Sequence, residues 1–357
     1  MPNRRSFLLG SGALLAGCSS AAPPVAAPAS TVPLAPPTPM ATPVQAAAPP
    51  PAASPPPVID EASFNRFLVQ VRADAARGGV SQAILQRALG NAKPIPRVLE
   101  LDRKQPEGVL SWEQYRERIV SQTRITNGRR VYAENRPLLQ AIEARYNVSA
   151  RVVVAIWGME TNYGSNTGGF KVVEALATLA WEGRRAAFFR AELMAALRIL
   201  EAGHVAPERM MGSWAGAMGQ PQFMPTSFER LAIDFDGDGH RDIWDNRGDA
   251  LGSIANYLAR SGWTSGAGWA IEARPPAGFD LQRADTETRR SMADWGRLGW
   301  RRADGSALPA GGEAYVAVPT RSTSQVFLGL PNLRTIRRYN SPMNYGLAVG
   351  LLADAVA

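Results

Sequence analysis

Cysteine, histidine and lysine are all scarce in this chain of 357 residues. The single cysteine excludes an intrachain disulfide and any zinc site built from two or more cysteines. The two histidines, His204 and His240, leave little basis for a histidine-rich metal site. Only three of the 39 basic residues are lysine, so arginine, which binds carboxylates and phosphates in a bidentate manner, carries the positive charge.

Long apolar runs are missing as well. No run reaches the roughly 18–20 residues that a membrane-spanning helix needs, which excludes a polytopic membrane protein. Apolar residues still make up 45% of the chain, enough for a sizeable core. The net charge is 39 − 31 = +8, but the basic residues are scattered and no basic stripe carries interleaved aromatics. This pattern argues against nucleic-acid binding and favours an anionic polymer as partner.

The first 58 residues predict an export signal and a tether. Residues 1–18 combine Arg4 and Arg5 with a short apolar stretch, as in a secretory signal, here of the twin-arginine type. The segment ending at Cys18 resembles a bacterial lipobox, in which that cysteine is lipidated; the alternative is an ordinary signal peptide. Residues 19–58 hold 14 of the 28 prolines and no charge, so we expect a disordered Pro/Ala-rich tether.

From residue 59 to residue 357 the pattern is mainly helical. Capping residues and glycines predict helices at 60–76, 81–90, 149–160, 184–201, 249–261 and 344–357, and a capping box at Ser111. Strand-like segments are few, at 269–273, 314–318 and 325–328. We therefore expect one mainly α (α+β) catalytic domain with a small α/β insertion near 268–330.

Glu160 is the first candidate for chemistry. Val153, Ile156, Trp157 and Glu160 share one helical face, so the carboxyl stands at the end of an apolar stripe. Burial disfavours the charged form and keeps a proton on the acid, as a general acid for glycosidic cleavage requires. The alternative is a surface glutamate at a helix end.

An Asp-rich loop follows. Asp234, Asp236 and Asp238 occupy positions 1, 3 and 5 of an EF-hand-like loop, with Gly239 at position 6 and the backbone carbonyl of His240 at position 7. Position 12 is Asp245 instead of the usual glutamate. Hard oxygen ligands favour a structural Ca²⁺; the alternative is an Asx-rich turn without a metal.

Two long motifs carry a family resemblance. Residues 158–164 (GMETNYG) and 212–225 (GSWAGAMGQPQFMP) resemble the lytic murein transglycosylase B family, and the resemblance continues through residues 182–185, 234–245, 255–257 and 338–341. It implies a lysozyme-like domain that cleaves peptidoglycan between N-acetylmuramic acid and N-acetylglucosamine. Glu160 would act as the single acid and base, and the muramoyl 6-hydroxyl would attack to leave a 1,6-anhydro end.

The resemblance also implies roles for further residues. Ser213 would hydrogen-bond to Glu160, and Asp249 would close the calcium loop. Arg184 and Arg185 would bind carboxylates of the muropeptide, unless they form only a solvated helix start. Substrate contacts would come from Gln222, Tyr257, Tyr339, Asn340, Tyr345 and, with a less certain alignment, Tyr115.

Three alternatives to this enzyme remain open. One is a peptidoglycan-binding or scaffolding lipoprotein without turnover, although Glu160 stands intact in its motif. The second is a hydrolysing muramidase, and a spatial carboxylate partner such as Glu174 or Glu182 would favour it. The third, a nucleic-acid binder, is the weakest. We expect a monomer in the periplasm, anchored at the outer membrane because Ser19 follows Cys18, with wall-synthesis proteins as further partners.

Overall fold

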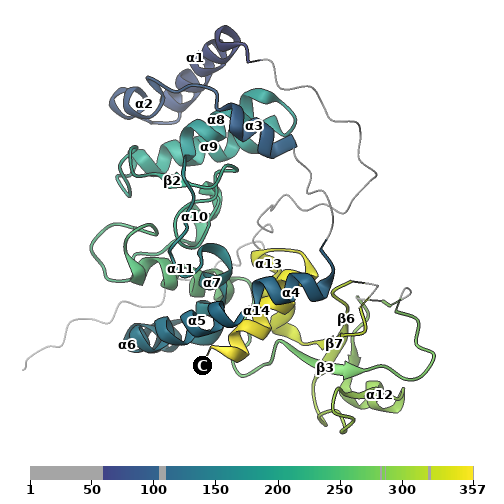
Figure 1. Cartoon of the computed structure of the whole chain (residues 1–357). Coiled ribbons are helices and arrows are strands. Elements are labelled where there is room, and N and C mark those ends of the chain that lie inside the picture. Colours follow the sequence, from purple (N-terminus) through teal and green to yellow (C-terminus); the bar gives the residue numbers. More distant parts are fainter. Residues whose placement is uncertain (1–58, 104–109, 282–283, 286, 321–322, 357) are drawn as a thin grey trace, which may run out of the picture. The chain divides into compact units, whose positions relative to one another are not determined.

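The computed structural model describes residues 59–356, with gaps at 104–109, 282–283, 286 and 321–322 (Figure 1). The predicted signal peptide, the tether and Cys18 lie outside the described residues. Within the described part, no helix combines the length and apolarity needed to cross a membrane.

Five helices pack around one apolar layer. They are α1 (Glu61–Arg77), α2 (Gln82–Leu89), α3 (Pro96–Arg103), α8 (Val172–Glu182) and α9 (Ala186–Glu201). Asp60 caps α1 by accepting a hydrogen bond from the Ser63 N–H at 3.0 Å. Helix α8 is buried on nearly every face, and α1, α2, α3 and α9 all contact it. Strand β1 (Phe170–Lys171), directly before α8, pairs antiparallel with β2 (Met211–Gly212), which follows α9.

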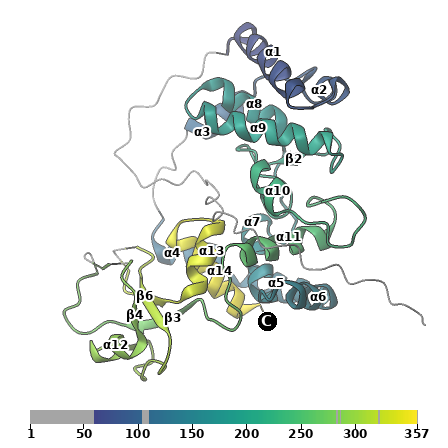
Figure 2. The ribbon, with the colours of Figure 1, turned by 180° about the vertical axis from the view of Figure 1, so that it is seen from behind.

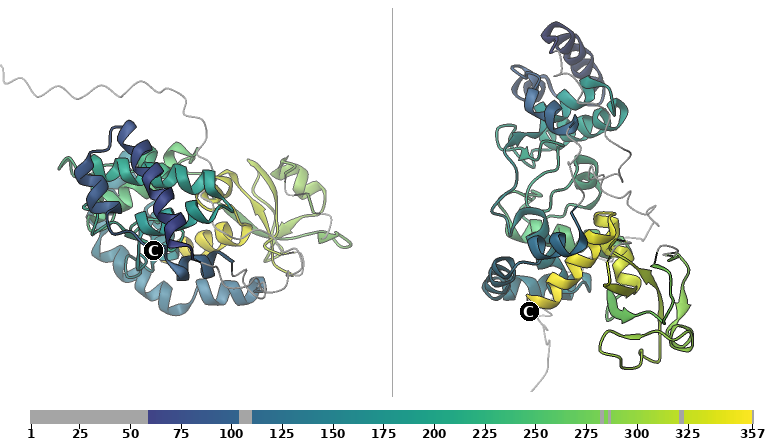
Figure 3. Two further views of the ribbon diagram at one scale, coloured as in Figure 1. Left: turned by 90° about the horizontal axis from the view of Figure 1, so that it is seen from above. Right: turned by 45° about the vertical axis from the view of Figure 1, so that its right-hand side comes forward.

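A second group of helices surrounds α7 (Ala150–Thr161). Helices α5 (Gln122–Glu134), α6 (Arg136–Tyr146), α11 (Arg247–Arg260) and α14 (Met343–Ala355) pack directly on it. Helix α4 (Trp112–Ile119) contacts α14, α13 (Pro331–Tyr339) contacts α11 and α14, and α10 (Pro225–Leu231) packs between α9 and α11. The C-terminal helices α13 and α14 are the yellow ribbons in Figure 3. Helices that precede α7 and helices that follow it thus both pack around it.

The insertion has its own small core. Five strands form a sheet in the order β4-β6-β7-β3-β5, and every pairing is antiparallel. The strands are β3 (Ala270–Arg274), β4 (Arg290–Ser291), β5 (Arg301–Arg302), β6 (Glu313–Ala317) and β7 (Val326–Gly329), with α12 (Met292–Arg297) beside them (Figure 2). Trp295, Trp300, Val316 and Leu328 fill the core beneath the sheet.

Most of the predicted elements are confirmed within a few residues. The three predicted strands are β3, β6 and β7, and the capping box at Ser111 forms as expected. The helix expected from Arg184 begins at Ala186 instead. The insertion is present, with strands that are all antiparallel.

Candidate active site

The last turn of α7 presents Glu160. From Val152 to Gly158 every residue of this helix is buried, so the helix is fixed in the core. It ends because Asn162 and Tyr163 adopt left-handed conformations, with φ of 49° and 61°. Their N–H groups return to the carbonyls of Gly158 and Trp157, which closes the helix end. Glu160 is half-buried and lies one turn after Trp157.

Tyr345 is the hydrogen-bond partner of Glu160. The phenol of this residue, in the first turn of α14, donates to Glu160 Oε1 at 2.6 Å. Burial raises the pKa of Glu160 from 4.5 to about 7, and the hydrogen bond from Tyr345 opposes that rise. Burial, together with the charge of Glu160, also raises the pKa of Tyr345 well above its ordinary value, so the phenol stays protonated. The carboxyl is therefore poised to hold and release a proton near neutrality.

Tyr115 and Tyr339 also lie close enough to feel the charge of Glu160. Burial, with a smaller contribution from Glu160, raises the pKa of Tyr115 to about 12 and that of Tyr339 well above its ordinary value. Tyr115, on α4, is half-buried and stacks on Trp112 with ring centroids 6.2 Å apart. Phenols from α4, α13 and α14 therefore lie near the acid, and that of Tyr345 is the one bonded to it.

Two predicted sugar contacts need correction. Tyr257 and Tyr339 are completely buried, and their ring centroids lie 4.6 Å apart. The Tyr339 hydroxyl donates to the Pro221 carbonyl at 2.6 Å, and the Tyr257 hydroxyl donates to the Arg338 carbonyl. Because both rings are buried and both hydroxyls donate to backbone carbonyls, neither residue can contact a sugar. They form part of the packed wall behind the site. Asn340, which follows Tyr339, is half-buried.

The predicted hydrogen bond from Ser213 to Glu160 does not form in this structure. The Ser213 hydroxyl accepts the Ala217 N–H at 3.0 Å and fixes the turn that follows β2. Gln222, also half-buried, adopts φ of 54° and donates its amide to the carbonyls of Thr167 and Gly219. Within the described residues its Oε1 has no hydrogen-bond partner, which leaves an acceptor for an amide N–H or a hydroxyl.

The arginine pair is held by a residue that the sequence did not single out. Asp102, on α3, is buried and accepts from Arg184 Nε at 3.0 Å and from Arg185 Nη2 at 2.7 Å. Arg184 also donates to the Asp102 carbonyl at 2.7 Å. Both guanidiniums remain partly exposed. The pair therefore stands at the start of α9 with its guanidiniums fixed by Asp102, and its role toward a muropeptide stays a prediction.

A second carboxylate does not join Glu160 in the described part of the chain. Glu174 pairs with Lys171 at 3.1 Å, and Glu182 pairs with Arg103 at 3.3 Å. Neither of them, nor any other described acid, contributes to the raised pKa of Glu160. A glycosidase that uses two carboxyls needs a pair about 5–10 Å apart. The raised pKa of Glu160 therefore comes from burial and not from a neighbouring described carboxylate, as expected for a single acid.

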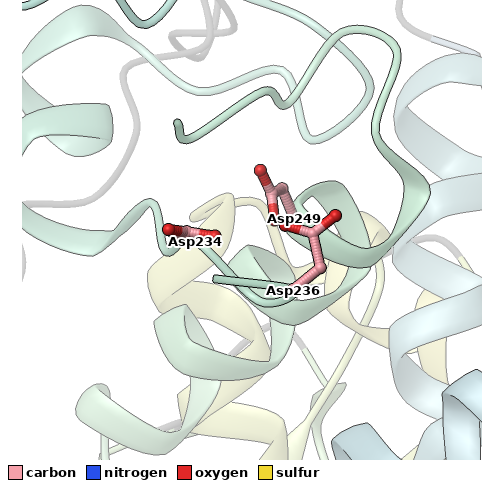
Figure 4. Close-up of side chains that lie close together, drawn as sticks. All are labelled: Asp234, Asp236 and Asp249. Atoms are coloured by element: carbon pink, nitrogen blue, oxygen red, sulfur yellow. The ribbon is translucent and has the colours of Figure 1, made fainter. Parts of the chain in front are cut away.

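The Asp-rich loop brings together Asp234, Asp236 and Asp249. One carboxylate oxygen from each lies within 4.8 Å of the others, and Figure 4 shows the three side chains converging. Asp249, on α11, is fully buried, and its carboxylate accepts the N–H groups of Phe235 and Asp242, both at 2.7 Å. Burial raises the pKa of Asp249 to about 6, and the charges of Asp236 and Asp234 add to the rise. This set of hard oxygens fits a divalent cation such as Ca²⁺.

The same loop separates the predicted ligands into two groups. Asp245, at position 12, forms an ion pair with Arg209 and lies outside the cluster, so the geometry favours Asp249 over Asp245 as the residue that closes the loop. Asp238 also lies outside the cluster, and its carboxylate accepts the His240 N–H at 2.8 Å. The His240 ring contacts the Gly203 carbonyl at 3.1 Å, consistent with a role for its backbone only.

Gln220 is a residue of the second motif to which the sequence gave no role. It is buried between the end of α7 and the end of the Asp-rich loop, and hydrogen-bonds to both. Its place inside a motif of glycines and small residues was a signal that it matters. Its partners could not be predicted, because they lie more than twenty positions away along the chain.

Comparison with known proteins places this geometry in a class of glycan-cleaving enzymes with a lysozyme-like fold. Residues 63–354 match the family described as "Transglycosylase SLT domain". Membrane-bound lytic murein transglycosylase B of Escherichia coli K12 is 33% identical over 297 residues, which cover 78% of this chain and 79% of that protein.

Solved structures agree with the sequence comparison. SltB3 from Pseudomonas aeruginosa, in complex with NAG-NAM-pentapeptide, has a TM-score of 0.80 and 45% identity, covering 82% of this chain and 79% of its own. The same protein was also solved with NAG-anhNAM-pentapeptide. Lytic transglycosylase Slt35 of Escherichia coli, in complex with calcium, has a TM-score of 0.70 and 32% identity, covering 83% and 93%.

The chain belongs to the transglycosylase SLT domain family. The predicted family, the lysozyme-like fold and the class of enzyme, a lytic transglycosylase, are thereby confirmed.

Proposed function

We propose that Glu160 alone performs both proton transfers in a lytic transglycosylase reaction on peptidoglycan. Its protonated carboxyl donates to the oxygen that links N-acetylmuramic acid to N-acetylglucosamine, and the anomeric C–O bond breaks. The resulting carboxylate takes the proton of the muramoyl 6-hydroxyl, whose oxygen bonds to the anomeric carbon. The products are a 1,6-anhydromuramoyl end and a free 4-hydroxyl on N-acetylglucosamine.

The observation that carries this proposal is a half-buried carboxyl whose pKa lies at about 7 and which has no carboxylate partner within the described residues. An internal nucleophile removes the need for a second acid on the enzyme. The anhydro sugar bound to the related Pseudomonas protein fits the same outcome.

Neighbouring groups support substrate binding. Gln222 Oε1 accepts an acetamido N–H or a sugar hydroxyl, and Tyr115 lines the approach to Glu160. Arg184, with 48% of its side chain exposed, binds a peptide carboxylate while Asp102 holds its inner edge. Asn340 and Ser213, both half-buried, stay candidates for contacts with the glycan.

The proposal extends to the cation and to the location. A Ca²⁺ ion bound by Asp234, Asp236 and Asp249 would neutralise three close carboxylates and stiffen the loop beside α11. Lipidation of Cys18 and the tether of residues 19–58 would hold the enzyme at the periplasmic face of the outer membrane. The related Escherichia coli protein is described as membrane-bound, in agreement with this location.

Digestion of purified sacculi tests the reaction. We expect mass spectrometry to find 1,6-anhydro ends with the wild type and a loss of at least about 100-fold with Glu160→Gln, because a general acid contributes roughly 10²–10⁴ in rate. Glycan binding by the variant should persist. Reducing ends produced by the wild type would indicate a hydrolase. A wild type that binds glycan but cleaves nothing would indicate a scaffold.

A further inference from the structure

Gln220 connects two distant parts of the chain through four hydrogen bonds. The residue lies between β2 and α10 and is only 8% exposed. Its backbone N–H donates to the Ile243 carbonyl at 2.9 Å, and its side-chain Nε2 donates to the Trp244 carbonyl at 2.8 Å. Its Oε1 and its backbone carbonyl accept from helix α7. Both its backbone and its side chain are therefore bonded on two opposite sides.

The two bonds to α7 bracket Glu160. The Trp157 indole N–H donates to Gln220 Oε1 at 2.9 Å, and the Thr161 hydroxyl donates to the Gln220 carbonyl at 3.1 Å. Trp157 precedes Glu160 by one helical turn, and Thr161 follows it directly. The Thr161 hydroxyl also accepts the Gly164 N–H at 3.0 Å, which holds the turn after the helix. One residue outside the helix thus fixes the turn that aims the carboxyl.

On its other side Gln220 is bonded to the end of the Asp-rich loop. The Trp244 N–H donates to Asp242 Oδ1 at 2.9 Å, and the Asp242 N–H donates to Asp249 Oδ2 at 2.7 Å. The Trp244 indole donates to the Met211 carbonyl at 2.8 Å, so this segment is itself held by β2. The loop is therefore a fixed support against which Gln220 can hold α7.

We propose that Gln220 is a positioning residue for the reaction and orients Glu160 by holding the last turn of α7 against the segment of Ile243 and Trp244. The inference rests on the proposed function of Glu160. Gln220 is not hydrogen-bonded to Glu160, and it is not proposed to bind the substrate. Its effect belongs to the chemical step, because an acid that is misplaced by about 1 Å can lose about 100-fold in rate.

The test compares Gln220→Met with Asn332→Leu. Both changes replace a buried amide by an apolar side chain of similar size, and Asn332 bonds only to Thr264 and Ala267, away from α7. We expect Gln220→Met to lower kcat by about 10- to 100-fold with KM changed less than about twofold, and to move the basic limb of the pH profile. Asn332→Leu should lose thermal stability but keep kcat and the pH profile below its Tm.

Equal kcat values and equal pH profiles for the two variants would overturn the proposal. If Gln220→Met does not fold, Thr161→Val carries the same test, because it removes one bond of the set, together with the bond from the Gly164 N–H, with almost no change in volume. A wild type that releases no anhydro ends would refute the proposed function. If the wild type releases anhydro ends and both Gln220→Met and Thr161→Val keep its kcat and pH profile, only the role of Gln220 is refuted.

Discussion

At the scale of single residues, the site depends on where Glu160 keeps its proton. In the folded protein its pKa lies at about 7, against 4.5 for an ordinary glutamate. A group whose pKa is raised by folding stabilises the fold fully at low pH, and this contribution is lost as the pH rises from 4.5 through 7. The enzyme therefore gives up stability at neutral pH to keep an acid protonated.

Replacing Glu160 by Gln should remove that cost. We expect Glu160→Gln to be more stable than the wild type above pH 7 by about 3 kcal/mol at most, because one pKa unit corresponds to 1.36 kcal/mol. Below pH 4.5 the two proteins should have equal stability. Thermal unfolding of both proteins between pH 4 and pH 8 measures the difference. A constant offset across this range would contradict a raised pKa in the native state.

The hydrogen bond from Tyr345 sets the upper end of the working range. It stabilises the carboxylate, so Tyr345→Phe should raise the pKa of Glu160. The basic limb of kcat/KM should move upward by about one to two pH units, given about 1.5–3 kcal/mol for a bond to a charged group. Tyr315→Phe, in a buried strand of the insertion, is the matched control and should leave the limb in place. A downward shift in Tyr345→Phe would refute this role.

At the scale of secondary-structure elements, the Asp-rich loop is the segment most sensitive to solution conditions. We expect Ca²⁺ at 100 times its Kd to stabilise the protein by about 3 kcal/mol, since a ligand that binds only the native state shifts unfolding by mass action. Asp249→Asn should abolish this gain, because the residue is buried in the cluster.

Asp245→Asn provides the control for that experiment. Its carboxylate pairs with Arg209 and lies outside the cluster, so the variant should keep the Ca²⁺-dependent rise in Tm. Differential scanning calorimetry with and without a chelator measures both effects. Loss of the calcium response in Asp245→Asn, with its retention in Asp249→Asn, would reverse the assignment of the ligands.

Elements with a strong local pattern were predictable, and contacts between distant elements were not. The stripe on α7 and the Asp spacing are local. The stripe places Glu160 as expected, and the spacing correctly brings Asp234 and Asp236 together but not Asp238 or Asp245. Helix α8 was missed because apolar residues cover all its faces and leave no periodic signal. The bond between Tyr345 and Glu160 spans 185 positions, and that between Asp102 and Arg184 spans 82, so no spacing rule could reveal their geometry.

At the scale of the whole molecule, α4 links the insertion to the site. Trp112 is completely buried among Tyr315, Phe327 and Leu347, and its indole donates to Gln325 at 2.5 Å. On its other side it stacks on Tyr115, which lies close to Glu160. The apolar cluster between the sheet and α14, which is distinct from the core around Trp295, and the wall of the site therefore share Trp112.

Trp112→Ala should therefore damage both stability and activity. We expect a loss of about 3–5 kcal/mol, typical of a large aromatic removed from a core, together with a fall in kcat/KM below the Tm. Trp295→Ala, in the separate core of the insertion, should cost similar stability and spare activity. Chemical denaturation and assays on sacculi measure both quantities. Equal activity in the two variants would show that α4 does not support Tyr115.

The position of Glu160 at the end of α7 has one more consequence. The backbone dipoles of a helix sum to a partial negative charge at its C-terminus, where an anionic side chain is disfavoured. Glu160 stands in the last turn, next to Thr161, the final residue of the helix. The helix itself thus works in the same direction as burial, and its backbone contribution stays the same whichever side chains surround the acid.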